Sequence, residues 1–155
     1  MNTGRWQLLG AALLFSTGGV AIKAISLNAW QVASFRSALA AAALYLLLPG
    51  ARKGYKLSYL APAIAYALML ITFVSATKLT TSANAIFLQS TAPLYLVFLG
   101  PLILKEKARR ADWLTLAVLG VGLSLFFLGE HAPLRTAPNP LAGNLLGALS
   151  GVMWA

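Results

Sequence analysis

The chain has 155 residues, of which 59% are hydrophobic and 10% are charged, and its net charge at pH 7 is +9. A soluble globular domain averages about 25% charged residues, so this composition excludes such a domain and equally excludes a disordered chain. A nucleic-acid-binding protein needs a basic face on a soluble fold, whereas these cations lie mainly in short loops between apolar runs. We therefore predict an all-α polytopic membrane protein whose partner is the lipid bilayer and not nucleic acid.

Groups that could hold a metal or perform catalysis are scarce. The chain has no cysteine, and His131 is its single histidine. A membrane enzyme would need clustered histidine, aspartate or serine residues at catalytic spacing, and no such cluster is visible. We expect no metal, no cofactor and no enzymatic activity.

The first two apolar runs cover residues 8–25 and 30–48. The first follows Arg5 like a signal peptide, but its length of about 18 residues and the later runs favour a retained helix. In it, Gly18 and Gly19 permit a bend or, as we favour, close helix packing, and Lys23 can reach the interface. The second run contains Arg36 inside the membrane, which either hydrogen-bonds helix-end carbonyls or contacts an anionic substrate.

The third run, residues 59–77, places apolar and polar side chains on one stripe at helical spacing. The members of this stripe are Tyr66, Met69, Phe73 and Thr77. Such a stripe is more often helix packing than a binding wall, although Tyr66 remains a candidate for the wall of a cavity, as does Thr17 on the first helix.

The fourth run, residues 82–104, is apolar, carries polar residues and is broken by Pro93. One face of this helix covers about 80° of arc at 100° per residue. It consists of Asn84, Phe87, Thr91, Tyr95 and Phe98. Pro93 frees a carbonyl near Gln89, whose own side chain points away from this face and is expected to link helices. We predict that the face lines a cavity.

The fifth run, residues 113–129, contains the small residues Gly120, Gly122 and Ser124, which would let another helix approach. A connector at 131–140 precedes a sixth run at 141–155. Most loop cations fall on one side of the membrane, whereas Lys23, Lys78 and Arg135 fall on the other. By the positive-inside rule, the N-terminus is cytoplasmic and the connector is external.

A short repeat links the first and sixth runs. The sequence Leu8-Leu9-Gly10-Ala11 recurs as Leu145-Leu146-Gly147-Ala148, and an amide residue precedes each copy. Five runs separate the copies, so a second unit beginning there would have inverted topology, as in many transporters with a midplane site. We expect residues 1–130 to form one five-helix repeat and 141–155 to start a second. The chain would then be part of a longer protein or a half-sized protomer that pairs with a second copy.

Several stretches together resemble one family, in the expected order along the chain. They are GGVAIKAIS, QVASFRSALAA with Arg36, ATKLTTSANAIFLQSTAPLYLVFLGPLILKE, WLTLAVLGVGLSLFFLG and GNLLGALSGVMWA. They resemble the EamA-type transporters of the drug/metabolite transporter superfamily, which have ten helices in two inverted five-helix repeats. This chain departs from the family pattern in its length, because the second repeat is missing after Ala155.

This resemblance implies a secondary transporter of amino acids or similar small metabolites, often an exporter, in a bacterial inner membrane. Asn84, Thr91 and Tyr95 would line the central cavity, and Glu106 would be a loop residue that ties helix ends together. A proton-coupled four-helix antiporter would need a carboxylate within the membrane, and no acidic residue is placed there. The alternative that stays open is a half-sized or truncated subunit with an assembly role that does not transport alone.

Overall fold

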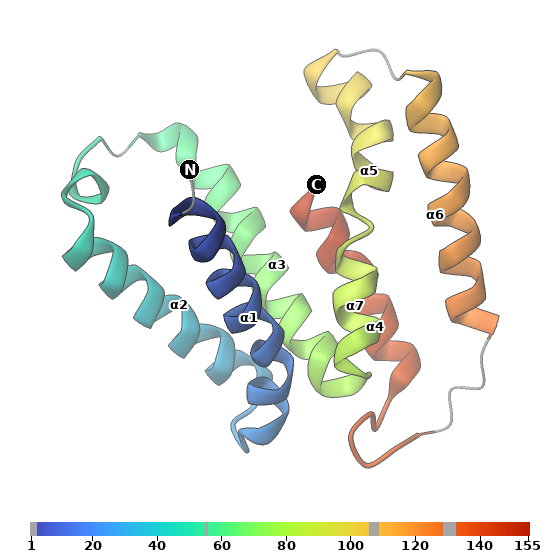
Figure 1. Cartoon of the computed structure of the whole chain (residues 1–155), viewed down its shortest axis with the longest axis horizontal. Helices are drawn as coiled ribbons and strands as arrows, with labels where there is room; N and C mark the ends of the chain where they lie inside the picture. Colours follow the sequence, from blue (N-terminus) through green and yellow to red (C-terminus); the bar gives the residue numbers. More distant parts are fainter. Residues whose placement is uncertain (1–2, 55, 106–108, 129–132) are drawn as a thin grey trace.

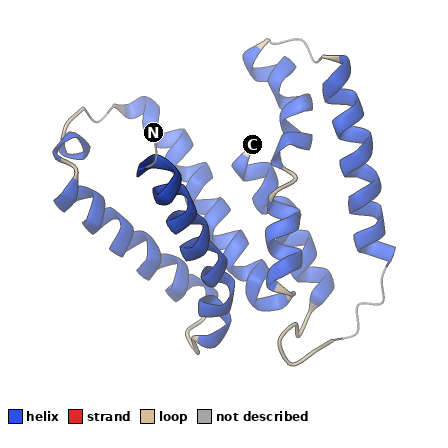
Figure 2. Ribbon diagram, in the orientation of Figure 1, coloured by secondary structure: helices blue, strands red, loops and turns tan. Residues whose placement is uncertain are grey.

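The computed structural model describes residues 3–54, 56–105, 109–128 and 133–155, and this part contains helices and no strand (Figure 2). The helices are α1 (Thr3–Ala24), α2 (Ala29–Leu47), α3 (Leu60–Leu79), α4 (Ser82–Gln89), α5 (Ala92–Leu99), α6 (Arg110–Leu128) and α7 (Pro140–Trp154). Two short 3-10 turns lie at Pro49–Arg52 and Leu57–Tyr59, and a π-helical turn at Gly100–Leu104 follows α5.

The predicted helices are present, with bounds that differ by a few residues. Three stretches of the described chain are long and apolar enough to cross a membrane, Gly4–Ala24, Leu57–Leu79 and Ser82–Leu102. The all-helical fold class is therefore confirmed, and the described spans suit a multi-pass membrane protein. That α2 and α6 also cross the membrane remains a prediction.

The helices run back and forth, so the connections gather at two ends of the molecule (Figure 1). The N-terminus, the α2–α3 connection and the π-helical turn lie at one end. The α1–α2 connection, the α3–α4 turn and residues 133–139 lie at the other. The described members of the two predicted sets of loop cations therefore lie on connections at opposite ends of the bundle.

Helix α7 lies against α3 and α4 and fills the middle of the bundle (Figure 1). Its buried residues include Gly143, Gly147 and Gly151, which are spaced four apart and so share one helix face. A Cβ built on Gly143 would lie 2.6 Å from the backbone nitrogen of Thr80, and one on Gly151 would lie 2.9 Å from the carbonyl oxygen of Leu88. Glycine lets the two backbones approach this closely, as at other helix contacts in membranes.

Helices α1, α2 and α3 form a second packed group. Ile22, Val32, Ala33 and Val74 are buried together. Helix α2 starts at a capping box in which Asn28 accepts from the Gln31 backbone and the Gln31 side chain accepts from the Asn28 backbone.

Of the two neighbouring glycines of α1, Gly18 and Gly19, one makes the expected close helix approach. A Cβ on Gly19 would lie 2.8 Å from the Cβ of Ser82 on α4, whereas nothing lies within 4 Å of one on Gly18.

Helix α6 stands at the edge of the molecule, beside α5 (Figure 1). Its small residues do not bring a helix backbone close: no described atom lies within 4 Å of a Cβ on Gly120, and one on Gly122 meets only the Phe87 ring at 3.6 Å. The expected close approach on the fifth helix is therefore not seen. The close approach is made instead by the glycine face of α7, which consists of Gly143, Gly147 and Gly151.

Replacing Gly143 by alanine is predicted to lower the free energy of unfolding by about 1–3 kcal/mol, because the new methyl group would overlap backbone atoms that cannot rotate away. Thermal unfolding of the protein in detergent measures the effect. Gly120→Ala is the matched control, since its site is open and alanine is the better helix former. Equal melting temperatures for the two variants would contradict the tight contact.

Candidate functional site

Four polar side chains meet where the α3–α4 turn touches α7, and we call Thr80, Thr81, Asn84 and Asn144 the polar junction. The Thr81 hydroxyl caps α4 by accepting from the Asn84 backbone nitrogen at 3.1 Å, and it donates to Asn84 Oδ1 at 2.7 Å. Asn144 Oδ1 accepts from the Thr80 hydroxyl at 2.8 Å and from Asn84 Nδ2 at 3.3 Å. The junction therefore ties three helices together by side-chain hydrogen bonds.

These hydrogen bonds contribute to stability because the groups that make them are buried. Thr80 and Asn144 are fully buried, and Asn144 Nδ2 has no hydrogen-bond partner among the described residues. A buried donor without an acceptor costs about 1–3 kcal/mol, so most proteins satisfy such groups. The junction thus holds a buried amide donor that no described acceptor satisfies.

The fourth predicted helix is interrupted next to the junction. Helix α4 ends at Gln89 and α5 begins at Ala92, so the predicted break at Pro93 is confirmed, and it falls just before that residue. Pro93 has no N–H to donate to the Gln89 carbonyl. At the break, the Thr91 hydroxyl donates to the Leu88 carbonyl at 2.6 Å, and Gly151 of α7 lies against the carbonyls of Leu88 and Gln89.

The predicted face of the fourth helix is divided by this break, and its members meet different neighbours. Asn84 belongs to the polar junction, and Thr91 is buried within the break. A Cβ on Gly151 would lie 3.1 Å from the Tyr95 ring, so Tyr95 faces α7. Phe87 lies near Gly122 of α6, and Phe98 packs edge to face on Trp113 of α6 with centroids 6.2 Å apart. The structure brings Asn84, Thr91 and Tyr95 toward α7, whereas Phe87 and Phe98 approach α6.

The other predicted site residues lie apart from this face. Tyr66 is 53% exposed and its ring is 6.4 Å from that of Trp154 on α7. Thr17 is exposed and donates to the Leu14 carbonyl of its own helix at 2.8 Å. Arg36 is exposed on α2 and makes no hydrogen bond or ion pair with a described residue. None of the three joins the polar junction.

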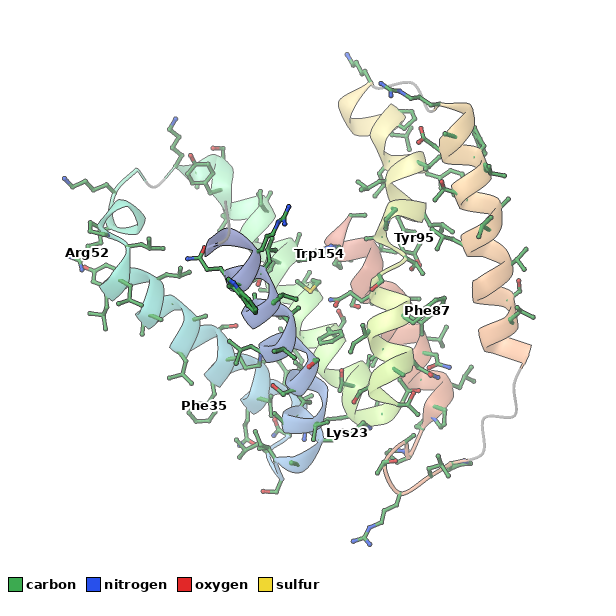
Figure 3. All side chains as sticks on the ribbon, viewed as in Figure 1. Lys23, Phe35, Arg52, Phe87, Tyr95 and Trp154 are labelled. Carbon is green, nitrogen blue, oxygen red and sulfur yellow. The ribbon has the colours of Figure 1, made fainter. Side chains whose placement is uncertain are left out.

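Two further expectations concern helix contacts. Gln89 Nε2 donates to Met69 Sδ at 3.0 Å, which confirms that Gln89 links α4 to α3. Lys23 does more than reach the interface, because its amine donates to the Thr80 carbonyl at 2.7 Å and also to the Thr136 carbonyl. Lys23 lies where α1 approaches the α3–α4 turn (Figure 3).

Sequence reasoning missed Asn144 and the cations around Lys23. A hollow of about 340 Å³ is lined by Lys23, Lys78, Arg135 and Thr136. The glycine spacing on the sixth run, with Asn144 beside Gly143, was the available signal for a helix contact there. The loop count places Lys23, Lys78 and Arg135 on the same side of the membrane, but it does not bring them to one hollow, because they are far apart in the sequence.

Metal ligands are not grouped in the described ranges, where no three histidine, cysteine, aspartate or glutamate residues lie together. Glu106, Glu130 and His131 lie outside the described residues. The described arrangement offers neutral hydrogen-bonding groups at the polar junction and cations at one end of the bundle, so it can bind polar or anionic groups.

Comparison with known proteins gives one match. The sequence model of the EamA-like transporter family matches residues 2–128. No curated protein and no solved structure matches the chain.

Breaking the polar junction is predicted to destabilise the fold cooperatively. Thr80→Val and Asn144→Ala should each lower the free energy of unfolding by about 1–3 kcal/mol. Thr80→Val removes one of the two donors to Asn144 Oδ1, and Asn144→Ala leaves the Thr80 hydroxyl and Asn84 Nδ2 without this acceptor. The double variant should lose less than the sum, with a coupling of at least about 0.5 kcal/mol. Thermal unfolding in detergent measures all three variants. Ser124→Ala is the control, because it removes an exposed hydroxyl that bonds only within α6 and should change the stability little. If the losses of stability in the two single variants simply add in the double variant, the direct hydrogen bond between Thr80 and Asn144 is contradicted.

Proposed function

Because the chain belongs to the EamA-like transporter family, we propose that it is a secondary transporter of amino acids or related small metabolites and that it exports them. The observation that carries this proposal is the family match over residues 2–128, nearly the whole of the predicted first repeat. The apolar helices agree with it, since they suit a multi-pass protein embedded in the lipid bilayer.

The interrupted fourth helix supports a substrate site beside α7. Transporters commonly form substrate sites at discontinuous membrane helices, where backbone groups freed from the helix and nearby polar side chains replace the hydration shell of the substrate. Here the break between α4 and α5 has Asn84 on one side and Tyr95 on the other. In this proposal Asn84 and Thr91 supply polar contacts and Tyr95 an apolar one beside α7. Phe87 and Phe98 supply apolar contacts on the side toward α6, and Tyr66 supplies one near Trp154.

Two residues outside this face keep their proposed roles. Thr17 on α1 completes the polar lining. Arg36 takes either of its two roles, contact with an anionic group or anchoring of helix ends. Its exposure on α2 and its lack of a described partner leave its guanidinium free to do either.

The proposed mechanism is alternating access between two inverted halves. Helix α7 carries the repeated sequence and packs on α4 through Gly147, whose Cβ would lie 3.1 Å from that of Leu88. Its equivalent in α1, Gly10, has nothing within 4 Å, so the matching face of α1 is open. A second half, from further residues of the polypeptide or from a second copy, would cover that face.

We place the transporter in the inner (plasma) membrane with a cytoplasmic N-terminus. The support is the uneven distribution of cations between the two ends of the bundle, because cytoplasmic loops carry the excess of lysine and arginine. The connector that contains Arg135 is external in this orientation.

Flux of amino acids in proteoliposomes containing the full-length protein tests the function. Asn84→Ala and Tyr95→Ala should raise KM about threefold to tenfold, the effect of losing one hydrogen bond or contact to substrate. The matched controls are Ile86→Ala and Leu96→Ala, on the same two helices, which are 43% and 44% exposed and should transport normally.

Melting temperatures separate loss of substrate contact from loss of fold in these variants. Unchanged KM in both site variants would contradict the proposed site. Absence of flux in the wild type would contradict transport and favour a membrane subunit with an assembly role.

A further inference from the structure

The three cations at the sparsely charged end of the bundle converge on one hollow. Lys23 comes from α1, Lys78 from α3, and Arg135 from the segment before α7, yet all three line the same space of about 340 Å³ together with Thr136. Among the described loop cations, these are the three that the loop count assigns to this end. Like charges repel, so their convergence needs an explanation in the fold or in a ligand.

The fold accounts for the position of both lysines. Lys23 donates to the carbonyls of Thr80 and Thr136, and Lys78 donates to the Ile25 carbonyl at 2.9 Å. These bonds satisfy carbonyls at the ends of α3 and α1. They leave N–H groups unused, because an ammonium has three, so Lys23 keeps one and Lys78 keeps two.

The position of Arg135 has a different cause. Leu134 and Ala137 exchange two backbone hydrogen bonds, of 3.1 and 2.9 Å, so Arg135 and Thr136 form the tip of a tight turn. Ala137 is buried, and the Asn139 nitrogen donates to the Leu79 carbonyl at 3.1 Å, which fixes the turn on the bundle. Arg135 is exposed and makes no hydrogen bond with a described residue, so its guanidinium is not held by the described fold.

Helix dipoles do not neutralise this charge. Helices α1, α3 and α6 end at this end of the bundle, and each C-terminus carries about half a negative charge. Helices α2, α4 and α7 begin at this end, and their N-termini carry the opposite partial charge, so these contributions roughly cancel. Asp112, the one acidic residue within the described ranges, is bonded to the Arg109 nitrogen near the other end.

We propose that this hollow binds a small oxyanion, a phosphate or carboxylate group carried by a soluble metabolite or by a lipid headgroup. Its three cations come from three elements and line one hollow, and each carries N–H groups beyond those used by the described fold, which suits an oxyanion. Its volume of about 340 Å³ admits a small anionic group together with water or with the rest of the molecule that carries the group. The proposal does not depend on transport, because an anion can bind here whether or not substrate crosses the membrane.

Inorganic phosphate is the first probe, titrated against chloride at equal ionic strength while thermal unfolding of the full-length protein is followed in detergent. Phosphate should raise the melting temperature of the wild type with a saturable dependence. Arg135→Gln should raise the half-saturating concentration about tenfold, since it removes one charge-assisted contact without removing a bond of the fold. Arg109→Gln, a matched arginine near the opposite end, should behave as the wild type.

The lipid source is distinguished in nanodiscs of neutral phosphatidylcholine with or without phosphatidylglycerol. If phosphatidylglycerol stabilises the wild type but not Arg135→Gln and abolishes the phosphate response, the bound oxyanion is a lipid headgroup. If the phosphate response persists, the bound oxyanion is soluble. Both results support the site, and neither requires measurement of flux.

Two results would overturn the proposal. The first is no response of the wild type to phosphate or to phosphatidylglycerol. The second is an equal response in the Arg135→Gln and Arg109→Gln variants, which would show only unspecific screening.

Discussion

The contact between the glycine face of α7 and the α3–α4 turn is the constraint on which the described bundle depends. With no side chains at Gly143, Gly147 and Gly151, the backbone of α7 lies directly on Thr80, Leu88 and the Gln89 carbonyl. In a membrane, helices gain little from excluding water, so close packing and buried hydrogen bonds decide which helices associate. Asn144 adds such bonds to Thr80 and Asn84 at the same contact. A helix from the predicted second unit thereby becomes part of the core of the first.

The same contact connects the fold to the proposed transport. The break between α4 and α5 needs something to cover its backbone, and Gly151 lies on the carbonyls there. A change in the position of α7 would therefore uncover both the break and the polar junction. Rocking of one half against the other would act on the groups proposed to bind substrate, as alternating access requires. Lys23 ties the end of α1 to the α3–α4 turn and to the turn before α7, so it bridges both sides of this contact.

The sequence predicted the helices well because apolar run length and proline position are local signals. Pro93 located the break, and Gln89 was expected to link helices, as it does with Met69. Predictions of which helices pack against each other were less accurate. The small residues of α6 suggested close packing, but the contact is made by α7, because glycine permits approach without choosing a neighbour. The predicted face of the fourth helix assumed a continuous helix, and the break divides it between α6 and α7. Convergence of Lys23, Lys78 and Arg135 arises only from tertiary structure.

Cross-linking of introduced cysteines tests most directly whether α7 docks on α3 as described. The chain has no cysteine of its own, so any link reports the chosen pair. Tyr66 of α3 and Trp154 of α7 are in ring contact and both exposed, whereas Trp113 lies on α6 at the edge of the bundle. A short bifunctional thiol reagent should link the pair Tyr66→Cys and Trp154→Cys efficiently in membranes, and should not link Tyr66→Cys with Trp113→Cys. Equal linking of the two pairs, or linking of the second alone, would contradict this account.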